Sequence, residues 1–240
     1  ASQLGMNVAC IEKRPTLGGT CLNVGCIPSK ALLNASEHFA GAASGTLGKL
    51  GISLGSVALD LKKMMQSKSD IVDTLTGGID FLFKKNKITR LVGSATITGV
   101  GSVTIVDGKD SGDYKAGKIM VATGSYPSSL PGITIDEKHI VSSTGALSLE
   151  TLPKKMVVIG AGYIGLELGT VWARLGAEVE IIEFLPRILP GMDAEIAKKF
   201  MTIAKKQGLK FRLSTAVKSA KGGKNGVSLT VTPANGGVEE

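Results

Sequence analysis

The stretch MVVIGAGYIGLELGTVWARLGAEVEIIEF, residues 156–184, decides the expected fold of this chain. A short apolar run leads into glycines at 160, 162 and 165, which are followed by a helical pattern over 163–175 and a second apolar run. Such glycines permit a tight turn, close approach of a pyrophosphate to the backbone, and close packing of the helix on the strand. The pattern is weak alone, but a strand before it and a helix after it make it specific. We therefore expect an α/β dinucleotide-binding unit in which Gly160, Gly162 and Gly165 contact the cofactor.

Two glutamates at strand ends are candidate ribose ligands. Glu183 stands about 20 residues after the second glycine, where a carboxylate accepts hydrogen bonds from a ribose diol. A carboxylate there repels a 2′-phosphate, so NAD is favoured over NADP, although the nearby Arg187 weakens this preference. The alternative is a glycine-rich turn that binds nothing, which the combined signals disfavour. Glu12 ends a short strand over residues 7–11 and raises the same question, but from the residues alone a surface glutamate is favoured.

A second motif, GGTCLNVGCIPSK at residues 18–30, holds two of the three cysteines. The spacing of Cys21 and Cys26 does not match the usual zinc pattern, and no second ligand pair follows. Pro28 suits the first turn of a helix, whose N-terminus favours a thiolate, and Lys30 adds positive charge nearby. If both cysteines lie on one helical stretch, they can close a small disulfide ring. Two idle thiols and a redox couple both remain open; a redox couple needs a flavin to exchange electrons with a nicotinamide.

Composition narrows the class of protein. The 240 residues are 43% apolar and 20% charged, which suits a globular chain of one large or two ordinary domains. No apolar run is long enough to span a membrane, and three cysteines do not make a secreted disulfide scaffold. The net charge is +8, but the lysines are scattered, which disfavours a nucleic-acid site. Cys10 lies in an apolar run and is expected in the core.

Hydrophobic periodicity predicts the remaining elements. Residues 60–85 read as one long amphipathic helix, although the glycines at 77 and 78 leave its continuity in doubt. Residues 118–122 read as a buried strand. Shorter elements are expected as helices over 29–40 and 193–207, strands over 88–93, 94–99, 102–106, 210–213 and 227–231, a loop over 41–55, and a linker over 149–155. We expect two domains, at residues 1–148 and 149–240.

Four segments together resemble the dihydrolipoyl dehydrogenases, within the flavin-dependent pyridine nucleotide disulfide oxidoreductase family. They are the cysteine motif at 18–30, ATGSYP at 122–127, VSSTGALSL at 141–149, and the glycine-rich stretch at 156–184. The resemblance covers essentially the whole chain. It implies two Rossmann-like nucleotide-binding domains of the FAD/NAD(P)-binding type, both incomplete here.

The resemblance also implies a role for individual residues. Cys21 corresponds to the interchange thiol that exchanges with the lipoyl disulfide, and Cys26 to the thiol beside the flavin that forms a charge-transfer complex. Lys30 corresponds to the lysine next to the flavin ring, so the implied catalytic residues are these three. The implied cofactor-binding residues are Glu12 (FAD adenosine ribose), Lys30, Ala95 (where the family usually has glycine), Thr123, Gly124 and Ser125 (the loop approaching FAD), Gly160, Gly162, Gly165 and Glu183 (NAD), and Glu167 (near the nicotinamide).

The implied reaction is reoxidation of protein-bound dihydrolipoamide, with electrons passing through the cysteine pair and FAD to NAD⁺. The implied partners are lipoyl domains of 2-oxo-acid dehydrogenase complexes or the H-protein of glycine cleavage, together with a second subunit in a homodimer. The mitochondrial matrix is the expected location, with a bacterial cytoplasm as the alternative. The family's first glycine turn, its second FAD segment and its His-Glu pair have no counterpart here, so we expect a partial chain that is inactive alone.

Neither His38 nor His139 lies in a His-Glu motif, and both are expected to be structural. Two alternatives stay open. One is a glutathione-type or other flavin disulfide reductase. The other is a non-catalytic NAD-binding fragment without a reactive dithiol.

Overall fold

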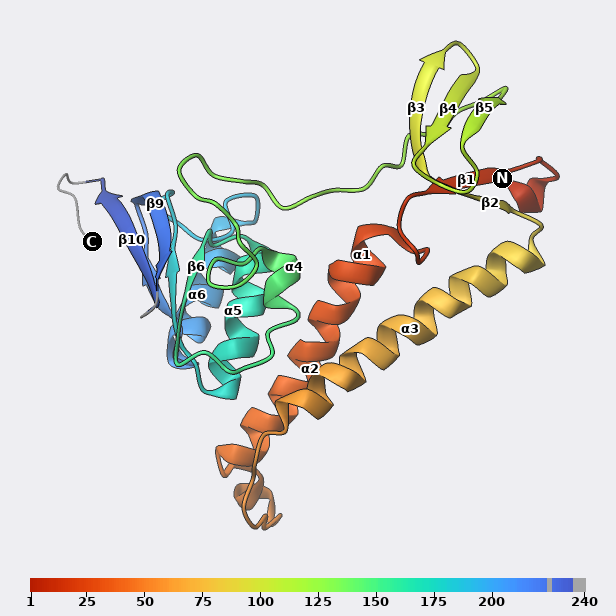
Figure 1. The fold of residues 1–240 in the computed structure, drawn as a ribbon. Coiled ribbons are helices and arrows are strands. Elements are labelled where there is room, and N and C mark those ends of the chain that lie inside the picture. The colour runs from red at the N-terminus through yellow and green to blue at the C-terminus, as the bar shows by residue number, and fades with distance from the viewer. Residues whose placement is uncertain (224–225, 235–240) are drawn as a thin grey trace. The chain divides into compact units, whose positions relative to one another are not determined.

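A computed structural model describes residues 1–223 and 226–234, and it forms two compact units (Figure 1). The first unit contains Ala1–Asn23 and Asp70–Tyr126, and the second contains Val24–Ser69 and Pro127–Glu240. Residues 224–225 and 235–240, the end of the expected second domain, lie outside the described residues. The expected division into domains at residue 148 stays a prediction.

The first unit is built on two small sheets. Strands β1 (Ala9–Glu12) and β2 (Thr89–Val92) pair in parallel, with Glu12 opposite Val92. The strands β3 (Ser94–Gly99), β4 (Ser102–Val106) and β5 (Gly112–Lys115) form an antiparallel sheet in that order (Figure 1). The 3₁₀ helix η1 (Ser2–Leu4) precedes β1. Val103 and Ile105 are the inward residues of β4, as expected from the period-2 alternation of a half-buried strand.

Helix α3 (Leu61–Lys85) is continuous through Gly77 and Gly78. Glycine costs about 1 kcal/mol in a helix interior relative to alanine. The helix nevertheless runs for 25 residues, because extending a helix that has already formed is much cheaper than nucleating one. The doubt about its continuity is thus removed.

The second unit holds a parallel sheet in the order β6 (Lys155–Ile159), β7 (Glu178–Ile182) and β8 (Lys210–Arg212). Helix α5 (Tyr163–Leu175) connects β6 to β7, and α6 (Ala194–Lys206) connects β7 to β8, as parallel pairing requires. The other elements are α2 (Cys26–Ala43), η2 (Thr46–Leu50), α4 (Ser143–Ala146) and the antiparallel pair β9 (Thr215–Gly223) and β10 (Gly226–Pro233).

The core of the second unit lies where α5 meets the sheet and α2. Val171 and Trp172 of α5 and Val179 and Ile181 of β7 have no exposed surface. Leu32 of α2 is equally buried and belongs to the same cluster. This core positions two parts of the chain that the sequence analysis singled out: the helix after the cysteine motif and the glycine turn before α5.

Two expectations about elements are corrected. Residues 118–122 form no strand, and Met120 and Val121 are 88% and 69% exposed. An apolar run is a buried strand only where strands flank it, and no described strand pairs with this one. The expected loop over 41–55 is partly helical, because α2 continues to Ala43 and η2 follows.

Among the described residues, no helix combines the length and the apolar character needed to cross a membrane.

Candidate functional site

The two cysteines of the motif lie on separate helices rather than on one helical stretch. Cys21 is in α1 (Gly19–Val24), and Cys26 is the first residue of α2. Gly25 separates the helices with φ −135° and ψ −115°, outside the helical region, so the condition of one continuous helical stretch is not met. Cys21 and Cys26 are both disulfide-bonded and Cys10 is free, so the pair is joined. The question of idle thiols is therefore answered in favour of a disulfide.

Lys30 lies one turn after Cys26 in α2 and meets Glu167 of α5. Its Nζ is 2.5 Å from Oε1 of Glu167, and the hydroxyl of Ser29 donates to Oε2 at 2.8 Å. Ser29 is only 7% exposed, whereas the Lys30 side chain is 59% exposed. Helix α2 thus places a cation one turn after Cys26, and the carboxylate of Glu167 in α5 pairs with it. Ser29 was not predicted as a site residue, although it stands between Pro28 and Lys30 of the cysteine motif.

The glycine turn before α5 has the backbone geometry that a phosphate-binding turn needs. Gly160 has φ +100°, a left-handed conformation that side chains disfavour. A Cβ on Gly165 would lie 2.3 Å from the carbonyl oxygen of Gly160, so only glycine permits this helix–turn contact. Gly162 caps α5, and its side-chain position opens to free space, as does that of Gly160. Unpaired N–H groups at a helix N-terminus favour an anion at that place.

Glu183 follows β7 directly, and its carboxylate contacts the backbone of the same glycine turn. Its Oε2 accepts from the backbone N–H of Ala161 at 2.7 Å, and its Oε1 accepts from the N–H of Leu185 at 2.8 Å. The residue is 8% exposed. A buried carboxylate is tolerated where hydrogen bonds satisfy it, and one of those bonds comes from the glycine turn itself. Arg187 donates instead to the carbonyl of Pro190, so its guanidinium does not pair with Glu183.

Apart from Lys30, which lies in the second unit, the residues expected to meet FAD belong to the first unit. Glu12 ends β1, and its Oε1 accepts from the N–H of Arg14 at 2.9 Å. Thr20 exchanges two hydrogen bonds with the backbone of Ser125, to its carbonyl at 3.1 Å and from its N–H at 3.3 Å. Gly124 has φ +80°, which suits a tight loop. These hydrogen bonds join α1 to the loop that contains residues 123–125.

The remaining residues that were singled out from the sequence are exposed or only partly buried. Ala95 is exposed on β3, and Thr123 is exposed in an irregular segment. Cys10 is half-buried rather than a core residue, and burial, with a contribution from Glu12, raises the pKa of its thiol. His38 and His139 are exposed.

A parallel sheet with a glycine turn at a helix N-terminus and a strand-end carboxylate is typical of the FAD/NAD(P)-binding fold. The chain belongs to the pyridine nucleotide-disulphide oxidoreductase family, whose model matches residues 1–240. Members of this family use FAD and NAD(P).

Several curated proteins are similar over the whole chain. Dihydrolipoyl dehydrogenase 3 of Pseudomonas aeruginosa is 50% identical, covering 100% of this chain and 51% of that protein. The mitochondrial dihydrolipoyl dehydrogenase 1 of Arabidopsis thaliana is 54% identical, covering 100% of this chain and 47% of that protein. The chain therefore spans about half the length of the curated relatives it matches.

A solved structure is also similar: the Cu(II) complex of the HOCl-induced flavoprotein disulfide reductase RclA of Escherichia coli. Its TM-score is 0.75 at 26% identity, and the match covers 95% of this chain and 48% of that one.

The residues present fit a pyridine dinucleotide. The open space over Gly160 and Gly162 admits phosphates, and the Glu183 carboxylate lies beside the same turn with its second lone pairs available for a ribose diol.

Proposed function

We propose that the protein containing this chain is a dihydrolipoyl dehydrogenase that oxidises protein-bound dihydrolipoamide with NAD⁺. The observation that carries the proposal is the Cys21–Cys26 disulfide at the start of α2, with Lys30 and Glu167 paired one turn further on. Similarity to dihydrolipoyl dehydrogenases at 50–54% identity over all of this chain supports the choice of substrate.

The proposed chemistry begins with thiol–disulfide exchange. A thiolate of dihydrolipoamide attacks Sγ of Cys21, which forms a mixed disulfide and releases the Cys26 thiolate. The second substrate thiolate then attacks the substrate sulfur of that mixed disulfide, closing the lipoyl ring and releasing Cys21. The substrate has lost two electrons and the cysteine pair has gained them.

The first residues of α2 assist the leaving group. Cys26 is at the N-terminal end of an 18-residue helix, where the helix dipole stabilises a thiolate. The Lys30 ammonium adds positive charge one turn later, held in place by Glu167. Bound FAD would supply the two-electron carrier between this cysteine pair and NAD⁺.

We assign the binding roles as follows. The proposed NAD ligands are Gly160, Gly162, Gly165 and Glu183, with Glu167 near the nicotinamide. The proposed FAD ligands are Glu12, Lys30, Ala95, Thr123, Gly124 and Ser125. In this scheme Glu183 selects NAD, because a second negative charge from a 2′-phosphate would face a buried carboxylate.

The proposed partners are lipoyl domains of 2-oxo-acid dehydrogenase complexes or the H-protein of glycine cleavage, and a second subunit in a homodimer. The relatives include mitochondrial and bacterial proteins, so both locations occur among them. We propose the mitochondrial matrix.

The test uses the full-length flavin-loaded protein. We expect NADH formation from dihydrolipoamide and NAD⁺, loss of that activity in Cys21→Ser and in Cys26→Ser, and a strong preference for NAD⁺ over NADP⁺. Turnover of glutathione with NADPH would instead support a glutathione-type reductase. A dithiol that neither substrate oxidises or reduces would support a binding fragment.

A further inference from the structure

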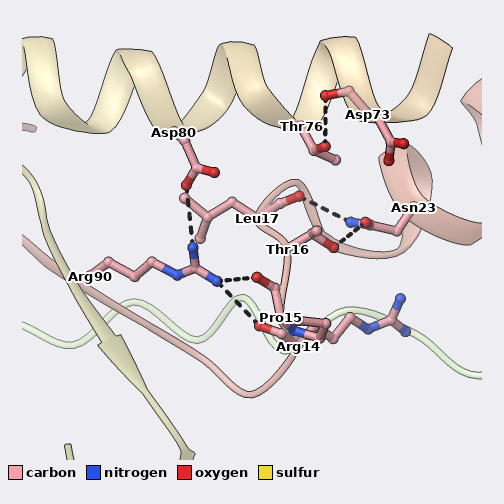
Figure 2. A network of polar contacts seen from close by, with 9 residues as sticks. All are labelled: Arg14, Pro15, Thr16, Leu17, Asn23, Asp73, Thr76, Asp80 and Arg90. Carbon is pink, nitrogen blue, oxygen red and sulfur yellow. Dashed lines mark hydrogen bonds and ion pairs between the residues drawn. The ribbon is translucent and has the colours of Figure 1, made fainter. Parts of the chain in front are cut away.

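Asn23 lies inside the ring that the disulfide closes, and its side chain is fully engaged with the segment before Cys21 (Figure 2). Its Nδ2 donates to the carbonyl oxygens of Leu17 at 3.0 Å and Gly19 at 2.9 Å. Its Oδ1 accepts from the hydroxyl of Thr16 at 2.6 Å. Both amide hydrogens and one acceptor site are thus used within residues 16–19.

The segment that Asn23 binds is itself tightly constrained. Gly18 and Gly19 have φ +106° and +64°, and a Cβ on Gly18 would lie 2.3 Å from Cδ2 of Leu22. Leu17 is 2% exposed. The turn therefore packs directly against α1 and leaves little room for movement.

Arg90 of β2 holds the other end of the same segment (Figure 2). Its Nη2 donates to the carbonyl of Pro15 at 2.6 Å and to that of Arg14 at 3.4 Å, while Nη1 pairs with Asp80 of α3 at 3.3 Å. Through these contacts residues 14–19 are joined to β2 and α3. Asn23 transmits that anchorage to the helix that carries Cys21.

None of the three bonds of Asn23 involves a cysteine atom, so all three can persist when the disulfide opens. We propose that Asn23 is a positioning residue that keeps the reduced Cys21 thiol close to Cys26 and so favours reclosure of the disulfide. This inference rests on the redox role given to the cysteine pair under the proposed function.

The physical reason is the effective concentration of one thiol at the other. Closing a short disulfide ring is favourable when both sulfurs are held in place, and becomes less so as the chain between them gains freedom. Removing the Asn23 side chain frees α1 from residues 16–19. The dithiol form then gains conformational entropy relative to the disulfide, and the equilibrium shifts toward the dithiol.

The equilibrium to measure is disulfide + 2 glutathione ⇌ dithiol + glutathione disulfide, without oxygen, in the full-length flavin-loaded protein. Alkylation followed by mass spectrometry reads the fraction of Cys21 and Cys26 in the dithiol form. The variants are Asn23→Ala, which removes all three bonds, and Thr16→Val, which removes one. The matched controls are Thr16→Ser, which keeps the hydroxyl, and Asn34→Ala at an exposed position of α2.

We expect the equilibrium constant to shift about tenfold toward the dithiol in Asn23→Ala and about threefold in Thr16→Val, because the freed segment gains conformational entropy mainly in the dithiol form, where no disulfide restrains it. Thr16→Ser and Asn34→Ala should match the wild type. If Asn23→Ala does not fold, Thr16→Val against Thr16→Ser carries the test.

Equal equilibrium constants in the wild type, Asn23→Ala and Thr16→Val would overturn the inference, even if the melting temperature fell, because the side chain would then only stabilise the fold. A wild-type disulfide that exchanges neither with glutathione nor with dihydrolipoamide would overturn the proposed function instead, and the inference with it.

Discussion

Glu183, which follows strand β7, and Glu12, which ends strand β1, make the same local contact. Each of these strands belongs to a different parallel sheet. Each accepts a hydrogen bond from the N–H two residues further on, Leu185 at 2.8 Å and Arg14 at 2.9 Å. Each carboxylate is thereby turned back over the edge of its sheet, where a strand-end acid meets a ribose. The repeated contact supports assigning both residues to nucleotide ribose groups, one in each unit.

Changing Glu183 to Gln tests the carboxylate directly. One of its two N–H partners would then face an amide N–H₂, an unsatisfied donor that costs about 1–3 kcal/mol of stability when buried. We expect the KM of Glu183→Gln for NADH to be about tenfold higher than that of the wild type. Its preference for NADH over NADPH should be smaller, and its urea midpoint should be lower. Glu180→Gln, on the same strand but paired with Arg212 at a partly exposed position, is the control and should change KM little.

Gly165→Ala tests the close approach of α5 to the glycine turn. The added methyl would lie 2.3 Å from the carbonyl oxygen of Gly160, and backbone cannot yield as a flexible side chain does. We expect a loss of about 1–3 kcal/mol in the free energy of unfolding, by urea titration, together with weaker NADH binding. Gly191→Ala adds a methyl where no atom lies within 4 Å and should be neutral in both assays. Wild-type NADH affinity in Gly165→Ala would remove this turn from the proposed site.

At the scale of elements, the sequence predicted those whose limits are set by local chemistry. Helix α5 runs from Tyr163 to Leu175 as expected, because it starts after Gly162 and ends at Gly176, which has φ +114°. Helix α6 starts where Asp193 caps it, accepting from the N–H groups of Glu195 and Ile196. Caps and periodicity are local, so they can be read without the fold.

The features that sequence reasoning missed depend on contacts between distant residues or on backbone conformation. Residues 118–122 have the composition of a buried strand, but burial depends on neighbours that composition does not report. The non-helical φ and ψ of Gly25 separate α1 from α2, a break that hydrophobic periodicity does not report. The pairing of Ser29 with Glu167 joins residues far apart in the chain, and only packing of α2 on α5 could reveal it.

Asp136 gives the segment before α4 a predictable pH dependence. Its Oδ1 accepts from the N–H groups of Ile140, Lys138 and His139, and these bonds lower the pKa of the carboxyl to about 2. The unfolded value is about 3.9, so the contribution to stability is complete above about pH 4 and is lost as the pH falls toward 2. We expect Asp136→Asn to be less stable than the wild type at pH 6, and the difference in melting temperature to shrink between pH 4 and pH 2.

The exposed Glu150 provides a control for this prediction. Glu150→Gln should leave the pH profile of melting temperature unchanged. A difference between wild type and Asp136→Asn that stayed constant down to pH 2 would mean that the charge of Asp136 does not stabilise the fold.

At the scale of the whole molecule, α5 links the two kinds of chemistry within the second unit. Its N-terminus carries the glycine turn, its second turn presents Glu167 to Lys30 of α2, and its C-terminal half forms the centre of the core. The proposed nucleotide site and the Lys30–Glu167 pair are therefore both built on α5. A substitution that disrupts the core around α5 should therefore weaken nucleotide binding and also slow the reaction of the cysteine pair.

Trp172→Phe tests this dependence, because Trp172 is fully buried and is the only tryptophan in the sequence. Its Nε1 donates to the carbonyl of Ala146 in α4 at 3.1 Å. Phenylalanine would leave that carbonyl without its donor and open a small cavity, which together cost about 2–4 kcal/mol of stability. We expect a lower urea midpoint by circular dichroism, with weaker NADH binding and slower dihydrolipoamide turnover in the full-length protein. Tyr163→Phe, at a 69% exposed position of the same helix, should keep the wild-type midpoint. If Trp172→Phe lost stability while both NADH binding and turnover stayed at wild-type values, α5 would not couple the two sites through its core.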